Sequence, residues 1–137
     1  SRGGFVSTYV AGQRPTEVAG LVLIYPAYVL QDQSKQRNPH PSTGPATSRL
    51  MGMTIGRIYD RDAQSFSIYD SMKKYPGNVL IIHGSADSIA PISYSRRAAQ
   101  TFPHARLVVV KGGQHGLYSK GWRLSIRDSL RFVINNL

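Results

Sequence analysis

Residues 79–91 read VLIIHGSADSIAP, and this stretch decides the fold. Its first four residues are apolar and partly β-branched, which is typical of a short strand buried on both faces of a parallel sheet. Small and polar residues follow, with Asp87 among them. Residues 107–116, LVVVKGGQHG, repeat the arrangement with His115 in the loop. The chain therefore places an acid and an imidazole directly after successive predicted strands.

The rest of the chain alternates predicted strands with predicted helices. Strands are predicted from short apolar runs at residues 21–24, 79–82 and 106–110. Helices are predicted at residues 3–11, 67–72, 92–102 and 122–137. Gly12 is expected to end the first helix, and the last helix is amphipathic, with an apolar set of Leu124, Ile126, Leu130, Phe132, Val133 and Leu137. This alternation predicts an α/β domain with a parallel sheet.

The chain opens with SRGG before its first predicted helix. With this opening, the HGSAD turn and the GGQHG loop, the chain resembles the C-terminal half of an α/β-hydrolase. Its pattern is similar to the bacterial serine-aminopeptidase-like and cinnamoyl (feruloyl) esterase-like hydrolases, and the order Ser, Asp, His is that of the family. The resemblance implies a partial α/β-hydrolase fold over residues 1–137, with C-terminal parallel strands and helices and an inserted cap.

The resemblance also implies a catalytic triad. Ser1 would be the nucleophile, His115 the general base and acid, and Asp87 the group that orients the imidazole. The backbone N–H of Arg2 would be one oxyanion-hole donor, since the residue after the nucleophile fills this role in the fold.

Each of these residues has a competing interpretation. Asp87 suits an Asx turn or a helix cap, a serine before two glycines could be a helix cap or a cloning scar, and Arg2 could be a solvated surface arginine. Among the other histidines, His83 is expected to hydrogen-bond locally after its strand. His40 and His104 lie in proline-rich segments and are weaker candidates than His115.

Residues 27–66 differ in character from the predicted core, because they contain Pro39, Pro41 and Pro45 and no long periodic segment. They are predicted to be an insertion between strands, which the resemblance implies is a cap or lid. The apolar residues Met51, Met53 and Ile55 could line a substrate pocket, but we favour a role in pinning the cap to the core.

The predicted function is hydrolysis of a small-molecule carboxylic ester through an acyl-enzyme, with no metal or organic cofactor. A peptidase or a thioesterase of the same fold uses the same triad. A truncated, non-catalytic fragment is a further alternative. In this fold a second oxyanion donor comes from an earlier loop, so we expect the chain alone to be poorly active.

Composition bounds the other possibilities. A formal net charge of +10 raises nucleic-acid binding as an alternative, but lysines and arginines are scattered from Arg2 to Arg131 with no basic run interleaved with aromatics. Such a module would bind DNA or RNA with a steep salt dependence. No apolar run has the roughly 20 residues of a membrane span. We therefore expect no nucleic-acid or membrane partner and a cytoplasmic location, and the absence of cysteine excludes disulfides.

Overall fold

The computed structural model describes residues 1–136 and divides the chain into two compact units. Unit 1 comprises Ser1–Tyr28 and Ile68–Leu137, and unit 2 comprises Val29–Ser67. Leu137, predicted to close the last helix, lies outside the described residues. Within those residues, no helix is long and apolar enough to cross a membrane.

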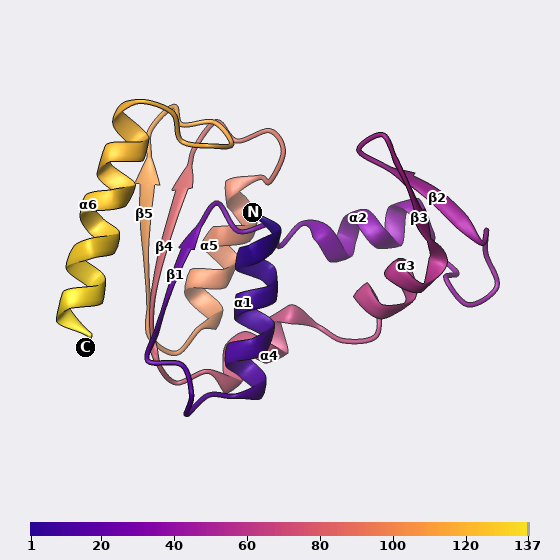
Figure 1. Ribbon diagram of the computed structural model, residues 1–137, viewed down its shortest axis with the longest axis horizontal. Coiled ribbons are helices and arrows are strands. Elements are labelled where there is room, and N and C mark those ends of the chain that lie inside the picture. The colour runs from indigo at the N-terminus through magenta and orange to yellow at the C-terminus, as the bar shows by residue number, and fades with distance from the viewer. Residues whose placement is uncertain (137) are drawn as a thin grey trace. The chain divides into compact units, whose positions relative to one another are not determined.

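Unit 1 is built on a three-stranded parallel sheet of order β1-β4-β5 (Figure 1). Its strands are β1 (Gly20–Ile24), β4 (Asn78–Gly84) and β5 (Ala105–Val110). β1 and β4 pair with Leu21 opposite Val79, and Val79 is in turn opposite Ala105 of β5. The predicted parallel α/β sheet is confirmed. Since the strands are parallel, their carboxyl ends all meet at one edge of the sheet, where the loops with Asp87 and His115 begin.

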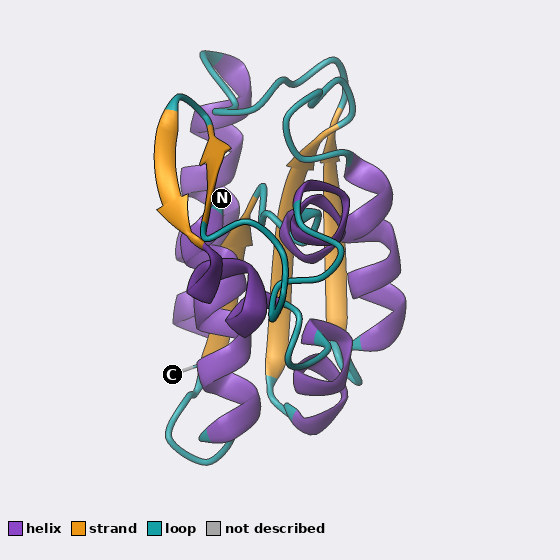
Figure 2. Ribbon diagram, turned by 90° about the vertical axis from the view of Figure 1, so that its right-hand side faces the viewer, coloured by secondary structure: helices purple, strands orange, loops and turns teal. Residues whose placement is uncertain are grey.

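Helices cover both faces of this sheet. They are α1 (Arg2–Gln13), α4 (Ile68–Lys74), α5 (Ile92–Thr101) and α6 (Lys120–Asn135). Figure 1 shows α6 on one face and the other three helices on the opposite face, and Figure 2 shows the same layers turned by 90°. This is the arrangement that buries a parallel sheet between two helical layers.

The sheet's centre is β4, in which every residue from Val79 to Gly84 is buried. On the α6 side, Leu80, Ile82 and Leu117 form a buried core against which Leu124 and Phe132 pack. Other members of the apolar set expected for α6 lie at the surface: Ile126, Leu130 and Val133 are 46%, 59% and 44% exposed. The helix therefore uses only part of its apolar stripe to cover the sheet.

Gly12 does not end the first helix as predicted, because α1 continues to Gln13. A side chain at Gly12 would place its Cβ 2.6 Å from the backbone oxygen of Ser71 in α4. The glycine is therefore explained by the close approach of two helices rather than by helix termination.

Unit 2 contains short regular elements that the sequence pattern did not predict. They are α2 (Leu30–Arg37), the antiparallel strands β2 (Thr47–Leu50) and β3 (Met53–Gly56), and α3 (Arg57–Ala63). Met51 and Gly52, both with positive φ, form the turn of this hairpin. Met51 and Met53 are 73% and 53% exposed, and the role of their side chains in pinning the cap to the core stays a prediction.

Candidate active site

Two loops at the carboxyl edge of the sheet are held together where they leave their strands. The backbone N–H of Ala86, after β4, donates to the carbonyl of Gly113, after β5, at 2.9 Å. The Ser85 hydroxyl accepts from the N–H of Gly112 at 2.8 Å. A Cβ on Gly84 would lie 2.1 Å from the Gly113 carbonyl oxygen, so only glycine permits this crossing. The crossing fixes the two loops that hold Asp87 and His115.

Asp87 uses its two carboxylate oxygens for different purposes. Oδ1 accepts the backbone N–H groups of Ile89 and Ala90 at 2.9 and 2.8 Å, which is the turn contact considered for this residue. Oδ2 lies 2.8 Å from Nδ1 of His115, which is the contact expected of a triad acid. The two interpretations of Asp87 are therefore compatible, one for each oxygen.

The surroundings of Asp87 favour its ionised form. Burial acts to raise its pKa, but the hydrogen bonds from Ala90, His115 and Ile89 more than offset this effect, so the pKa lies below its ordinary value. The carboxylate is therefore charged near neutral pH and accepts a hydrogen bond from the neighbouring imidazole.

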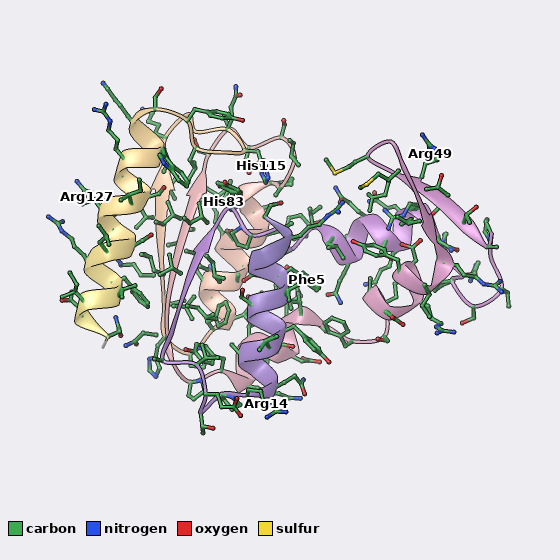
Figure 3. The ribbon with its side chains drawn as sticks, in the orientation of Figure 1. Phe5, Arg14, Arg49, His83, His115 and Arg127 are labelled. Atoms are coloured by element: carbon green, nitrogen blue, oxygen red, sulfur yellow. The ribbon has the colours of Figure 1, made fainter. Side chains whose placement is uncertain are left out.

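His115 is oriented on two sides. Because Asp87 accepts from Nδ1, the neutral ring carries its free electron pair on Nε2, the nitrogen that a general base uses. The Tyr25 ring packs against the imidazole with centroids 4.6 Å apart and a tilt of 56°. His115 is partly exposed, at 19% of its side chain, and Figure 3 shows it at the same end of the sheet as His83.

Ser1 lies beside the end of β1. Its amino nitrogen donates to the Ile24 carbonyl at 3.3 Å, and its carbonyl accepts from the N–H of Ala27 at 3.0 Å. The pKa of the Ser1 amino group is lowered, because its burial outweighs the opposing effect of the Asp87 carboxylate. No hydrogen bond joins the Ser1 hydroxyl to His115 in the part of the chain that is described. The structure thus joins Asp87 to His115 directly and brings Ser1 to the same edge.

Arg2 is the first residue of α1. Backbone N–H groups in the first turn of a helix point out of its N-terminus, where they and the helix dipole favour negative charge. Its position is therefore compatible with the oxyanion role expected for its backbone N–H.

His83 has a larger part in the site than the sequence suggested. The side chain is fully buried, and its Nε2 lies 3.0 Å from Asp87 Oδ2 and 2.7 Å from the Ala90 carbonyl. Its Nδ1 lies 2.6 Å from the Ser95 hydroxyl. These contacts are local, as predicted, but one of them reaches the acid beside His115. The available signal was a polar side chain closing an otherwise apolar buried strand, because such a group must find partners.

Burial lowers the pKa of His83, and its hydrogen bonds to Ala90 and Asp87 oppose this effect only in part. The ring is therefore neutral near pH 7. Nε2 faces two acceptors and must carry the proton, which leaves Nδ1 to accept from Ser95.

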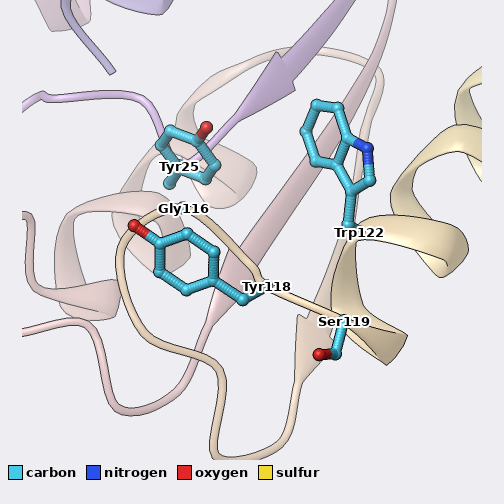
Figure 4. A pocket seen from close by; sticks show the side chains of 5 residues that line it. All are labelled: Tyr25, Gly116, Tyr118, Ser119 and Trp122. Carbon is cyan, nitrogen blue, oxygen red and sulfur yellow. The ribbon is translucent and has the colours of Figure 1, made fainter.

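An open pocket of about 430 Å³ is formed mostly by residues that come shortly after His115 in the chain. It is lined by Tyr25, Gly116, Tyr118, Ser119 and Trp122 (Figure 4). Tyr25 and Ser119 have positive φ values of 39° and 58°, which non-glycine residues rarely adopt. Strained backbone of this kind concentrates at functional sites, so the pocket is a candidate binding surface. Among residues 1–136, no group of three or more His, Cys, Asp or Glu side chains could hold a metal ion.

Comparison with known proteins assigns the chain to a family. The Abhydrolase_4 family, described as TAP-like protein, matches residues 60–130. The chain therefore belongs to this family of the α/β-hydrolase superfamily, and the partial α/β-hydrolase fold expected from its motifs is confirmed.

Individual relatives agree with this assignment. The non-heme chloroperoxidase CPO-A1 of Kitasatospora aureofaciens is 37% identical over 70 residues, which are 49% of this chain and 26% of that protein. The structure of Est1E from Butyrivibrio proteoclasticus with ferulic acid bound matches 99% of this chain with a TM-score of 0.88 and 22% identity, over 57% of its own chain. A monoacylglycerol lipase from Paleococcus ferrophilus matches 100% of this chain with a TM-score of 0.73 and 17% identity, over 66% of its own chain.

The chain thus spans about a quarter of the curated relative and 57% of the Est1E chain. At these identities the two solved structures establish the fold. Solved structures that share this fold include lipases and esterases, among them the lipase from Paleococcus ferrophilus.

Proposed function

We propose that this chain carries the triad of a serine hydrolase that acts on carboxylic esters through an acyl-enzyme. The observation that carries the proposal is the 2.8 Å contact between Asp87 Oδ2 and His115 Nδ1, beside Ser1 at the carboxyl edge of the sheet. A carboxylate on one imidazole nitrogen leaves the other nitrogen to take the proton of a nucleophile.

In the proposed reaction, the Ser1 hydroxyl oxygen attacks the ester carbonyl carbon while Nε2 of His115 takes the hydroxyl proton. The backbone N–H of Arg2 stabilises the oxyanion of the tetrahedral intermediate. The imidazolium then gives its proton to the leaving alcohol oxygen, and the acyl group stays on Ser1. Water loses a proton to His115 and attacks the acyl carbonyl, and the imidazolium returns that proton to the Ser1 oxygen as the acid leaves. Asp87 stays ionised throughout.

The substrate class we propose is a small-molecule ester. Est1E, whose fold this chain shares, was solved with ferulic acid bound, and the candidate pocket here is lined by aromatic side chains. An amide or a thioester could be cleaved by the same three residues, so comparison of matched ester, thioester and aminoacyl substrates decides the reaction class.

We further propose that unit 2, residues 29–67, serves as the cap of this hydrolase, in the place of the insertion predicted over residues 27–66. Replacing the unit by a short linker should change the preference among ester substrates and leave labelling of Ser1 by a small serine probe in place. If the protein without unit 2 folds but is no longer labelled at Ser1, unit 2 has a role beyond that of a cap, and this proposal is rejected.

The decisive experiment is labelling with a fluorophosphonate serine probe, applied to this chain and to a version extended upstream. We expect weak labelling of the chain alone and strong labelling of the extended protein at Ser1, abolished by Ser1→Ala and by His115→Ala. A well-folded extended protein that is not labelled would contradict the hydrolase proposal and favour a non-catalytic role.

A further inference from the structure

Two imidazoles share one oxygen of Asp87. His115 Nδ1 lies 2.8 Å and His83 Nε2 lies 3.0 Å from Oδ2. The proposed reaction uses only the first of these rings. His83 is fully buried and has no access to a substrate, so any part it takes in the reaction must pass through Asp87.

The proton on His83 has a fixed position. The Ala90 carbonyl and the Asp87 carboxylate, at 2.7 and 3.0 Å, are both acceptors, so Nε2 is the donor. On the other side of the ring, the Ser95 hydroxyl lies 2.6 Å from Nδ1 and donates to it. A serine of α5 thereby holds the ring in the tautomer that donates toward the acid.

Asp87 needs a donor on Oδ2 from a second direction. Its Oδ1 accepts hydrogen bonds from the N–H groups of Ile89 and Ala90. These bonds hold Oδ1 in place but still allow the carboxylate to rotate and move Oδ2. A donor from the buried end of β4 fixes the position of Oδ2 and thus the plane of the carboxylate. With His83 and His115, the carboxylate has two donors on each oxygen, which fills its hydrogen-bonding capacity.

We propose that His83 is a positioning residue of the triad: held in one tautomer by Ser95, it fixes Asp87 so that Oδ2 faces His115. The inference rests on the proposed function, because it gives His83 a role in orienting the general base. It adds to the Ser1, Asp87 and His115 constellation a fourth residue that never touches the substrate.

The test uses two substitutions of similar size and polarity. Gln at position 83 places an amide N–H near the position of Nε2 and keeps a donor to Asp87. Asn is one methylene shorter, keeps an acceptor near the Ser95 hydroxyl and does not reach Oδ2. His83→Asn and His83→Gln therefore differ chiefly in the contact that the proposal requires. A third variant, His83→Leu with Ser95→Ala, removes both partners of the Ser95 bond and so avoids an unpaired buried hydroxyl.

The readout is the proton on Nδ1 of His115 in this chain labelled with ¹⁵N-histidine, assigned by its loss in His115→Ala. Because this proton is hydrogen-bonded to the buried Asp87 carboxylate, we expect it to give a far-downfield signal in the unaltered chain. We expect loss of the signal in His83→Asn and in the double variant, and its retention in His83→Gln, while β4 and β5 amide signals report an intact fold.

An unchanged His115 signal in folded His83→Asn or in the folded double variant would overturn the proposal, as would its loss in folded His83→Gln. Because no turnover is measured, failure of Ser1 labelling would reject the hydrolase and still leave this spectroscopic result as a separate fact about Asp87.

Discussion

The side chains of Asp87 in unit 1 and Asp60 in unit 2 are both fully buried with several partners, and the two carboxylates differ in what surrounds them. Asp87 in unit 1 is bonded to two imidazoles and two backbone N–H groups. Asp60 in unit 2 is bonded to the Arg37 guanidinium and to the hydroxyls of Ser34 and Ser48, the last two at 2.8 and 3.3 Å.

The partners determine what each carboxylate can do. A guanidinium keeps its charge at every accessible pH and has no electron pair to offer, so the Asp60 cluster can only hold α2, β2 and α3 together. An imidazole bonded through one nitrogen keeps an electron pair on the other, so Asp87 can support proton transfer. Burial and hydrogen bonding are common to both carboxylates, so we base the proposed role of Asp87 on the titratable character of its partners.

The largest expected effect comes from removing the charge of Asp87. In the upstream-extended protein, Asp87→Asn should lower the rate of Ser1 labelling by about 10⁴-fold, because an amide no longer selects the required imidazole tautomer. Asp60→Asn is the matched control and should label at close to the normal rate. Near-equal rates in the two variants would remove the functional distinction between the carboxylates.

A side chain added where the two loops cross should lower the free energy of unfolding of unit 1 and leave unit 2 unaffected. Gly84→Ala places a methyl group 2.1 Å from the Gly113 carbonyl oxygen, and because backbone must move to admit it, we expect a loss of about 3 kcal/mol in urea unfolding. Gly3→Ala in α1, where no atom lies within 4 Å of the added Cβ, should gain up to about 1 kcal/mol from helix propensity. Equal stability of the two variants would mean that the crossing tolerates a side chain.

Removing the charge of Asp60 should destabilise unit 2 without affecting the chemistry. Asp60→Asn leaves the Arg37 guanidinium, whose side chain is only 14% exposed, without its counterion, and we expect a cost of about 2–3 kcal/mol. Amide hydrogen exchange in α2 and α3 should accelerate. Asp62→Asn is the control, since that side chain is 72% exposed and its contact with Arg61 is 3.9 Å long. If α2 and α3 still exchange slowly in Asp60→Asn, the hydroxyls of Ser34 and Ser48 are enough to hold unit 2 together without the ion pair.

The smallest expected effect is a pH dependence of unit 1. The pKa of His83 is below its ordinary 6.5 in the folded chain. As pH falls below 6.5, the unfolded chain binds a proton that the folded chain does not, so the free energy of unfolding decreases. Asp87, whose pKa is below 3.8, adds stability that is present above 3.8 and is lost as pH falls through its folded value.

His83→Gln should remove the decrease in unfolding free energy below pH 6.5, which comes from His83, and keep the decrease below pH 3.8, which comes from Asp87. Urea unfolding at a series of pH values measures both. The same acid-induced decrease near pH 6 in the variant and the unaltered chain would assign the effect to another group.

Much of unit 1 could be predicted from the sequence because its strands are continuous apolar runs. The run 79–82 lies inside β4, and the loops that follow β4 and β5 bring Asp87 and His115 together. The short elements of unit 2 were missed, since four-residue strands in a hairpin show no hydrophobic period, and its interior is organised by polar side chains around Asp60.

His83 was undervalued for a different reason. The sequence shows a histidine at a strand end, but only the fold brings α5 and its Ser95 against the ring. In the same way, the spacing of Ile126 and Leu130 predicts an apolar stripe on α6, but these two side chains are 46% and 59% exposed in the folded chain.

The order of the strands has a consequence for how the site assembles. Pairing of β4 with β5 needs only the α5 connection, whereas pairing of β1 with β4 brings Gly20 to Asn78 across the whole of unit 2. The entropic cost of closing a loop grows with its flexible length, so a unit 2 that folds by itself shortens the effective loop. We therefore expect the Asp87–His115 contact to form early during folding and Ser1, attached to the end of β1, to join it last. Pulse-labelled hydrogen exchange should accordingly protect β5 before β1, and destabilising unit 2 should delay only the second step.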